Sequence, residues 1–327
     1  MSDAGPIVLM GNAPPPARPT SRLGRWSQRV LPSGRTLVTS VPYLWLLLFF
    51  LIPFVIVLKI SFSDTLIAMP PYEALFNWAA DQVLEIKLHL SNFAFLYEDD
   101  LYWQSYLTSL FVAGVSTLLC LLIGYPMAYA IARTNTATRN ILLLLVILPF
   151  WSNFLIRVYA WMIILGPNAA LARSLNALLG VFGQEPVSLL FSSFAVLVCL
   201  VYVHLPFMVL PLYANLEKHD QALLDAAQDL GANAWQRFWR ITFPLSLPGV
   251  YAGSALVFIP AFGIFAIPDI LGGPNDSLIG NVIKQQFLET RDWPFGSVLS
   301  IVLTVCALAI AGLAAWVGRR GAGRLAA

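Results

Sequence analysis

The sequence predicts an all-α membrane protein with six transmembrane helices and both termini in the cytoplasm. Of its 327 residues, 58% are hydrophobic and only 11% are charged, and the mean hydropathy is +0.74. This composition is far from that of a soluble domain. The net charge of +2 is small, and no basic, aromatic-rich face is evident, so the sequence does not indicate nucleic-acid binding.

Six apolar segments are long enough to cross a bilayer, which takes about 20 consecutive, mostly apolar residues in a helix. They cover residues 41–62, 104–132, 140–166, 188–213, 247–271 and 297–318. The stretch before the first segment is polar and Pro-rich, and no small-residue cleavage site follows a short apolar core, so we expect this segment to remain in the mature chain. The expected organisation is a tail (1–40), a six-helix domain (41–318) and a second tail (319–327).

Lysine and arginine are distributed unevenly between the two sides of this arrangement. One side has thirteen of them: Arg18, Arg22, Arg25, Arg29, Arg35, Arg133, Arg139, Lys218, Arg237, Arg240, Arg319, Arg320 and Arg324. The other side has six: Lys59, Lys87, Arg157, Arg173, Lys284 and Arg291. Because short cytoplasmic loops retain basic residues, the thirteen are expected to be cytoplasmic.

The largest internal cytoplasmic loop is then residues 215–245, between the fourth and fifth spans, and its pattern predicts two short helices. The first ends at Gly231, a typical helix C-cap. The second begins at Asn233, with Gln236 three residues on in a capping-box pattern, and is expected to end at Pro244.

The two helices differ in surface chemistry, which separates docking to a protein from resting on lipid. The first has two alanines among three acids (Asp220, Asp225 and Asp229) and favours close approach by another protein. The second has large aromatic side chains beside arginines (Trp235, Arg237, Phe238, Trp239 and Arg240), as an interfacial helix does.

The same loop resembles the EAA loop of ABC importer permeases. The matching positions are Ala226, Ala227, Gly231, Ile241 and Pro244, with Asp225 where the family usually has glutamate. The resemblance implies that these six residues form the coupling helix and its flank, which sit in a groove of a cytoplasmic ATPase. Asp225 keeps the charge with a shorter reach.

Longer segments resemble the polyamine importer permeases, and among them the putrescine-type subunit. Examples are "TRNILLLLVILPFWSNFLIRVYAWM" in the third span and "ALVFIPAFGIFAIPDILGGP" in the fifth. The resemblance implies a type I importer transmembrane domain in a bacterial inner membrane, with putrescine as cargo and spermidine as the alternative. It also implies a periplasmic binding protein, a second permease in a heterodimer, and two ATPase subunits that hydrolyse the ATP, so this chain would be no enzyme and need no cofactor.

Other functions remain as alternatives: a permease for another small solute, a secondary transporter working alone, or a membrane anchor. The spans lack the paired carboxylates of a proton or sodium site, which disfavours the secondary transporter.

A tentative substrate path runs beside the fifth span, where Pro260, Gly263 and Pro268 interrupt the helix. Asp269 follows and can pair with an amine of a diamine, or simply cap a helix end. Trp151, Tyr159 and Trp161 of the third span can make cation–π contacts with an ammonium group, or serve only in packing. The polyamine family often has glutamate after the glycine of this segment, where this chain has Ile264, so we do not expect this chain to supply the main ligand.

The remaining polar or sulfur-containing residues of the spans are interpreted mainly as structural. The three cysteines (Cys120, Cys199 and Cys306) lie singly in apolar runs without metal or redox spacing, so we expect packing roles and no metal site. His204 is read as a core histidine rather than a proton relay, and Arg157 as a snorkelling or helix-pairing residue rather than a substrate contact.

Overall fold

The computed structural model describes residues 34–325, except 75, 79–83, 87 and 275. The chain divides into two compact units, residues 1–56 and 57–327. The first unit contains α2 (Gly34–Leu46), a π-helical turn η1 (Leu47–Leu51) and the start of α3 (Ile52–Ser61). The expected tail 1–40 lies mostly outside the described residues, but α2 already begins within it.

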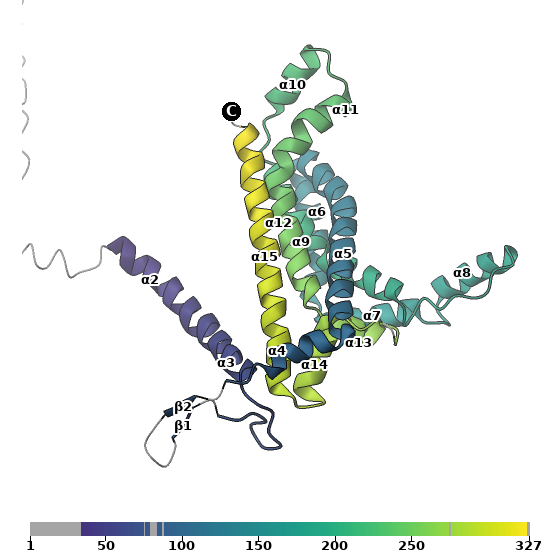
Figure 1. Cartoon of the computed structure of the whole chain (residues 1–327). Coiled ribbons are helices and arrows are strands. Elements are labelled where there is room, and N and C mark those ends of the chain that lie inside the picture. Colours follow the sequence, from purple (N-terminus) through teal and green to yellow (C-terminus); the bar gives the residue numbers. More distant parts are fainter. Residues whose placement is uncertain (1–33, 75, 79–83, 87, 275, 326–327) are drawn as a thin grey trace, which may run out of the picture. The chain divides into compact units, whose positions relative to one another are not determined.

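The second unit is largely helical, as Figure 1 shows. Its helices are α4 (Ser91–Glu98), α5 (Asp100–Arg133), α6 (Thr136–Ile147), α7 (Phe154–Leu165), α8 (Ala170–Val181), α9 (Ser193–Leu216), α10 (Gln221–Asp229), α11 (Ala234–Arg237), α12 (Phe243–Phe262), α13 (Ala266–Leu271), α14 (Ile279–Leu288) and α15 (Trp293–Leu325). Two short strands that the sequence analysis did not predict, β1 (Phe76–Trp78) and β2 (Leu84–Ile86), pair antiparallel.

Among the described residues, six helical stretches are long and apolar enough to cross a membrane, as the sequence predicts. They are Val38–Ser61, Asp100–Arg133, Phe154–Val181, Ser193–Leu216, Ala234–Phe262 and Trp293–Ala314. The last helix continues to Leu325, so the expected tail from residue 319 is helical over most of its length. Glycines near this end do not stop the helix, since an isolated glycine weakens a helix by only about 1 kcal/mol.

The third span differs from the continuous helix expected over residues 140–166. Helix α6 passes into a 3-10 turn, η2 (Leu148–Trp151), and the chain then becomes extended at Ser152. Asn153 starts a new helix, because its side chain accepts a hydrogen bond from the Leu155 amide at 2.8 Å. This is an ordinary N-cap, which the apolar run concealed.

The fifth span starts earlier than expected, because Pro244 does not end the second loop helix. Helix α11 continues through a π-helical segment, η3 (Phe238–Thr242), directly into α12. The Phe243 amide bonds to the Phe238 carbonyl, five residues back. Pro244 then occupies the first turn of α12, where a missing N–H is tolerated. Gly263 ends α12, as the sequence predicts, but the expected interruptions at Pro260 and Pro268 are wrong, because Pro260 lies inside α12 and Pro268 inside α13.

Three helices, α5, α9 and α12, form the centre of the second unit and run side by side in Figure 1. Helices α9 and α12 approach closely at Gly249 and Gly253, where a Cβ atom would lie 2.8 Å from the Asn215 Cβ and from the Met208 sulfur, respectively. Small residues at such a crossing let two helices pack closely in a membrane. Across α5 and α12, the Tyr125 and Ser246 hydroxyls are hydrogen-bonded at 2.9 Å. Helices α10 and α11 lie at one end of this bundle, and α13 and α14 at the other.

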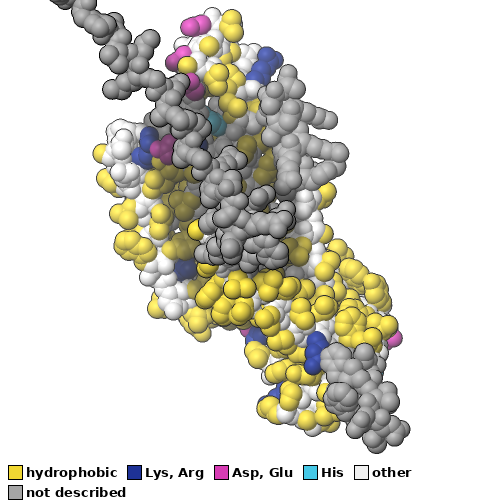
Figure 2. Space-filling view, turned by 90° about the vertical axis from the view of Figure 1, so that its left-hand side faces the viewer, with side chains coloured by type: hydrophobic (Ala, Val, Ile, Leu, Met, Phe, Trp, Pro, Cys, Tyr) yellow, Lys and Arg dark blue, Asp and Glu magenta, His cyan; other side chains and the backbone are white. Residues whose placement is uncertain are grey.

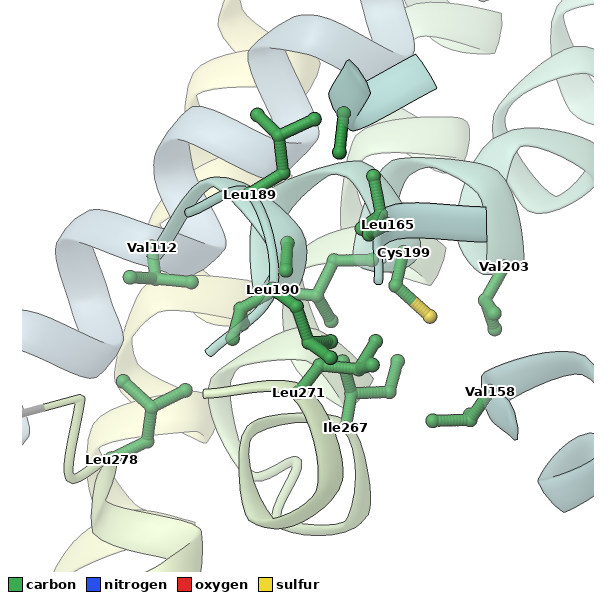
Figure 3. Packing of buried hydrophobic residues seen from close by; sticks show 14 residues of the cluster. Val112, Val158, Leu165, Leu189, Leu190, Cys199, Val203, Ile267, Leu271 and Leu278 are labelled. Atoms are coloured by element: carbon green, nitrogen blue, oxygen red, sulfur yellow. The ribbon is translucent and has the colours of Figure 1, made fainter. Parts of the chain in front are cut away.

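Helix α13 is held in a separate apolar cluster with α7 and α9. Figure 3 shows Ile267 and Leu271 of α13 pointing toward Leu190 and Cys199. All four side chains are buried. Packing on this side therefore fixes α13 and leaves the opposite side of that short helix, which carries Asp269, free for polar contacts.

The cysteines and His204 of the spans are packed or hydrogen-bonded within the helical bundle. Cys120 and Cys199 are buried and Cys306 is half-buried, and all three are free thiols, in keeping with packing roles. The His204 Nδ1 lies 2.9 Å from the Leu200 carbonyl oxygen, which can only accept, so this nitrogen carries the proton. His204 is thus a hydrogen-bonded core residue.

Arg157 does not snorkel to water, because only 8% of the residue is exposed. Its guanidinium lies over the rings of Phe150 and Phe154, with 5.1 and 5.9 Å to the ring centres. Its Nε and Nη1 atoms have no hydrogen-bond partner within the described ranges. Among the described residues, the guanidinium is therefore stabilised by cation–π contacts with these two aromatic rings.

Candidate functional site

The first part of the site is helix α10, which carries the small residues of the loop between the fourth and fifth spans. Asp220 caps it, accepting a hydrogen bond from the Ala222 amide at 2.9 Å. Asp225 and Ala226 are exposed and Ala227 is half-buried. Figure 2 shows charged side chains gathered at this end of the molecule and hydrophobic ones over its flank. Helix α10 thus offers small and acidic side chains, next to the exposed Leu223 and Leu230.

Gly231 ends α10 in the way the sequence predicts, with a φ of +85°. The Gly231 amide bonds to the Gln228 carbonyl at 2.8 Å, and the Ala232 amide bonds to the Ala227 carbonyl at 2.9 Å. This pair of bonds is a Schellman motif, which needs a left-handed residue at its centre. No atom lies within 4 Å of a Cβ built at Gly231, so backbone conformation alone selects glycine here.

Helix α11 begins with the predicted capping box. The Asn233 side chain accepts from the Gln236 amide at 2.8 Å, and the Gln236 side chain accepts from the Asn233 amide at 3.0 Å. Phe238, at the start of η3, packs edge-on against Tyr125 of α5, with 5.7 Å between ring centres. The glycine turn therefore sets the end of α10, and η3, which continues α11 without a break, is held against α5.

A hollow of about 420 Å³ lies at the elbow between α10 and η3. Its lining includes three of the predicted coupling residues, Ala227, Gly231 and Ile241, together with Arg237 and Arg240. Asp225 and Ala226 lie on α10 outside this lining, and Pro244 lies beyond η3 in the first turn of α12. The structure therefore brings part of the predicted set together around one hollow.

Several contacts that the sequence analysis did not identify hold the loop in place. Arg237 Nη1 donates to Gln228 Oε1 at 2.6 Å across the elbow. At the base of the loop, Arg139 of α6 forms an ion pair with Glu217 at 2.5 Å. Arg133 of α5 donates to the Gln221 side chain. One indication of these contacts was present in the sequence, since Arg133 and Arg139 lie close together between the second and third spans. The sequence analysis used them only to assign topology.

His219 lies in the link between α9 and α10. Burial of its imidazole lowers its pKa below the usual value, and the nearby Arg133 charge lowers the pKa further. The Nε2 atom is buried and has no hydrogen-bond partner among the described residues. A neutral ring is therefore favoured in the folded loop.

The second part of the site is Asp269, at the opposite end of the bundle. Its Oδ2 accepts from Lys284 Nζ at 2.6 Å, and its Oδ1 accepts from Asn281 Nδ2 at 2.7 Å. The Asp269 carboxylate raises the pKa of Lys284, mainly through this hydrogen bond. Lys284 and Asn281 were not predicted as site residues. Their spacing of three places both on one face of α14, but nothing in the sequence says that this face meets α13.

The three aromatic candidates of the third span are separated by the structure. Trp161 is packed edge-on against Tyr202, with 5.5 Å between ring centres. Trp151 is 74% exposed and Tyr159 is 51% exposed. Helix α7, which carries Tyr159 and Trp161, does pack against α13, which carries Asp269. Only Trp161 therefore has an evident packing role.

The chain is similar in sequence to a known family of transport proteins. Residues 120–321 match the sequence profile of the family described as "Binding-protein-dependent transport system inner membrane component". The chain is 42% identical, over 82% of its length and 88% of the relative, to the spermidine/putrescine transport system permease protein PotB of Haemophilus influenzae. It is 49% identical, over 63% of its length and 74% of the relative, to PotB of Escherichia coli (strain K12).

The fold has also been seen in solved structures. A chain of a bacterial alginate ABC transporter, in complex with an alginate-bound periplasmic protein, aligns with a TM-score of 0.68 at 19% identity. The alignment covers 92% of this chain and 98% of the other. At this low identity the similarity shows only the fold, which is that of an ABC importer transmembrane subunit.

Proposed function

The chain belongs to the family of binding-protein-dependent transport system inner membrane components, and we propose that its cargo is a polyamine, putrescine or spermidine. The chain is a multi-pass inner-membrane permease and does not itself hydrolyse ATP. The proposal on cargo is supported by the names of the relatives at 42% and 49% identity. A permease for another small solute is the alternative.

In the proposed arrangement the chain is a type I importer subunit with both termini and the α10–α11 loop in the cytoplasm. The permease domain covers residues 41–318, with the coupling loop at 215–245 and cytoplasmic tails at 1–40 and 319–327. The split of thirteen basic residues against six supports this orientation. In intact spheroplasts, an impermeant maleimide should label a cysteine at Thr290 but not one at Asn233. Equal labelling at both positions would contradict this topology.

The single observation that carries the coupling role is the geometry of α10. A short helix with two consecutive alanines ends in a left-handed glycine and borders a hollow at the elbow. Such a helix can enter a cleft of a partner without displacing large side chains. The residues proposed for coupling are Asp225, Ala226, Ala227, Gly231, Ile241 and Pro244. In this proposal, closure of the ATPase moves α10, and α12 carries the motion into the bundle.

The proposed complex has two ATPase subunits, a second permease in a heterodimer and a periplasmic polyamine-binding protein. Family membership implies an ATPase and a binding protein as partners. The number of ATPases and the heterodimer rest on the resemblance to polyamine importers. The proposed substrate path includes Asp269, Trp161, Tyr159 and Trp151.

A secondary transporter is a weaker alternative on charge grounds. Residues 38–61, 101–132, 154–181, 193–216, 234–262 and 293–314 contain no Asp or Glu. Secondary transporters driven by protons or sodium commonly place carboxylates inside the membrane. Apart from Asp100, the first residue of the second stretch, the candidate spans therefore lack these ion-coupling groups.

The test is uptake of radiolabelled putrescine by the purified complex in proteoliposomes, with binding protein outside and ATP inside. We expect ATP-dependent uptake that unlabelled putrescine and spermidine reduce and amino acids do not. Uptake that needs no ATP, or that only amino acids reduce, would contradict the proposal. Isolation of the chain from native membranes without an ATPase would also contradict it.

A further inference from the structure

We infer that Asp269 and Asn281 form a binding site for a primary ammonium group, and that Lys284 occupies this site until a cargo amine displaces it. The inference rests on the proposed polyamine transport. It adds two residues to that proposal. Lys284 occupies the site when no cargo is bound, and Glu289 pairs with Lys284 after the cargo has displaced it.

The site consists of the Asp269 carboxylate, which Lys284 and Asn281 both contact as donors. Asp269 contributes its carboxylate, whose Oδ2 lies 2.6 Å from Lys284 Nζ. The Asn281 amide nitrogen is held at 2.7 Å from Asp269 Oδ1 and at 3.2 Å from the Phe265 carbonyl oxygen. This arrangement leaves Asn281 Oδ1 buried and without a donor in the described part of the chain. An acceptor beside the carboxylate is thus available for a further N–H group.

Lys284 and the proposed cargo carry the same functional group. The Lys284 side chain ends in a primary alkylammonium with three donors, as does each end of a protonated diamine. A carboxylate that holds one such group at hydrogen-bond distance can hold the other in the same way. Lys284 is therefore a competitor for the cargo within the chain itself.

Glu289 provides a second position for the displaced lysine. Its Oε1 lies 3.8 Å from Lys284 Nζ, at the C-terminal end of the same helix. Lys284, Asp269 and Glu289 together carry a net charge of −1, so one added ammonium makes the group neutral. After the exchange, Asp269 pairs with the cargo ammonium and Glu289 pairs with Lys284, so every charge in the group has a partner.

The position of the pair allows cargo to reach it. The side chains of Lys284 and Asp269 are 28% and 33% exposed, so neither is sealed from solvent. The contact also joins two sets of helices, because α13 packs on α7 and α9 while α14 packs on α5 and α15. At its start α14 is anchored to α5, where the Ile279 amide donates to Ser109 Oγ at 2.8 Å. With the start of α14 anchored in this way, the inference places the displacement in the Lys284 side chain.

The direct test is equilibrium dialysis of radiolabelled putrescine against the complete complex in nanodiscs, without binding protein. Lys284→Met removes the competitor and should tighten putrescine binding about threefold, in line with a partly exposed ion pair. Lys284→Arg keeps the charge and can hold Asp269 through two hydrogen bonds, so binding should weaken. Asp269→Asn should abolish this binding with or without Lys284→Met. Arg173→Met, which removes an exposed cation on α8 outside both parts of the site, is the control and should bind as wild type.

Opposite effects of the methionine and arginine variants are the result expected for a resident competitor. If Lys284→Met weakens binding or leaves it unchanged, the pair is only a link between helices and the inference is wrong. Butylamine should compete for the site and 1,4-butanediol should not; competition by the diol would also overturn it. Putrescine uptake by the wild-type complex is measured in parallel. Absence of uptake would contradict the proposed function, whereas normal uptake with unaltered binding in all variants would contradict this inference alone.

Discussion

The Arg237 guanidinium donates to the Gln228 side chain at 2.6 Å and so joins α11 to α10 across the turn at Gly231. This contact and the glycine turn act on the same quantity, the angle between the two helices. Because η3 continues α11 into α12 without a break, that angle also sets the direction of α10 relative to the fifth span. A force applied to α10 can therefore reach the membrane through a continuous helix.

Gly231→Val should uncouple ATP hydrolysis from uptake, whereas Gly231→Asn should largely preserve both. The φ of +85° costs a β-branched residue about 1–2 kcal/mol, and asparagine tolerates the left-handed region better. Because no atom lies near the missing Cβ, size alone should not matter. The measurement is ATPase activity stimulated by loaded binding protein, together with uptake, in purified complexes. Equal loss in both variants would point to steric exclusion instead of backbone conformation.

Ala227→Trp should prevent docking of α10, while Ala227→Ser should not. Ala227 is half-buried and borders the hollow at the elbow, so in the proposed complex an indole there would take up space between α10 and the ATPase. Overpacking of this kind commonly costs about 1–3 kcal/mol. We expect the tryptophan variant to insert into the membrane and to retain the second permease, but to lose the ATPase on co-purification. Retention of the ATPase with normal uptake would show that α10 is only a surface helix.

Arg157→Met should leave the thermal stability of the isolated chain unchanged or raise it. The guanidinium is buried against two phenylalanine rings, and two of its nitrogens have no hydrogen-bond partner in the described part of the structure. Replacing a buried charge by an apolar group of similar length is often neutral or favourable. The measurement is the midpoint of thermal unfolding in detergent. A fall equivalent to several kcal/mol would show that Arg157 has a strong ionic partner.

His219→Gln should remove part of the loss of stability at low pH. The pKa of His219 is lowered in the folded chain, so the unfolded chain binds the proton more readily. Stability from the neutral ring is therefore present above the usual histidine pKa of about 6.5 and falls as the pH drops below it. Unfolding midpoints of both proteins at pH 7.5 and pH 5.5 measure this. An identical drop in wild type and variant would exclude His219 as the cause.

Local features of the loop could be predicted from sequence because each depends on a few neighbouring residues. The Asn233–Gln236 capping box and the Gly231 turn are set by side chains and φ angles within one helical turn. Pro244 shows the limit of this approach. Proline ends a helix only where its N–H is needed, and the π-helical segment before it changes that requirement.

Contacts between distant segments could not be predicted in the same way. Asp269 was identified as a candidate, but its pairing with Lys284 depends on how α13 and α14 meet after the break at Gly263. Arg133 and Arg139 were used only to predict topology, and their bonds to the base of the α10–α11 loop depend on the packing of α5, α6 and α9. Hydropathy and charge place such residues at one end of a helix and do not select their partners.

The central claim, that α10 docks to the ATPase, is tested most directly by site-specific cross-linking in the complete complex. Single cysteines replace Asp225, Ala226 or Asp229, three polar or small positions on α10, in a chain whose Cys120, Cys199 and Cys306 have been changed to serine or alanine. Thr290→Cys, at the opposite end of the bundle, is the control. With a short bifunctional maleimide, we predict adducts between the ATPase and the α10 positions and none from Thr290→Cys. Absence of ATPase adducts at all three α10 positions in an active complex would contradict the account.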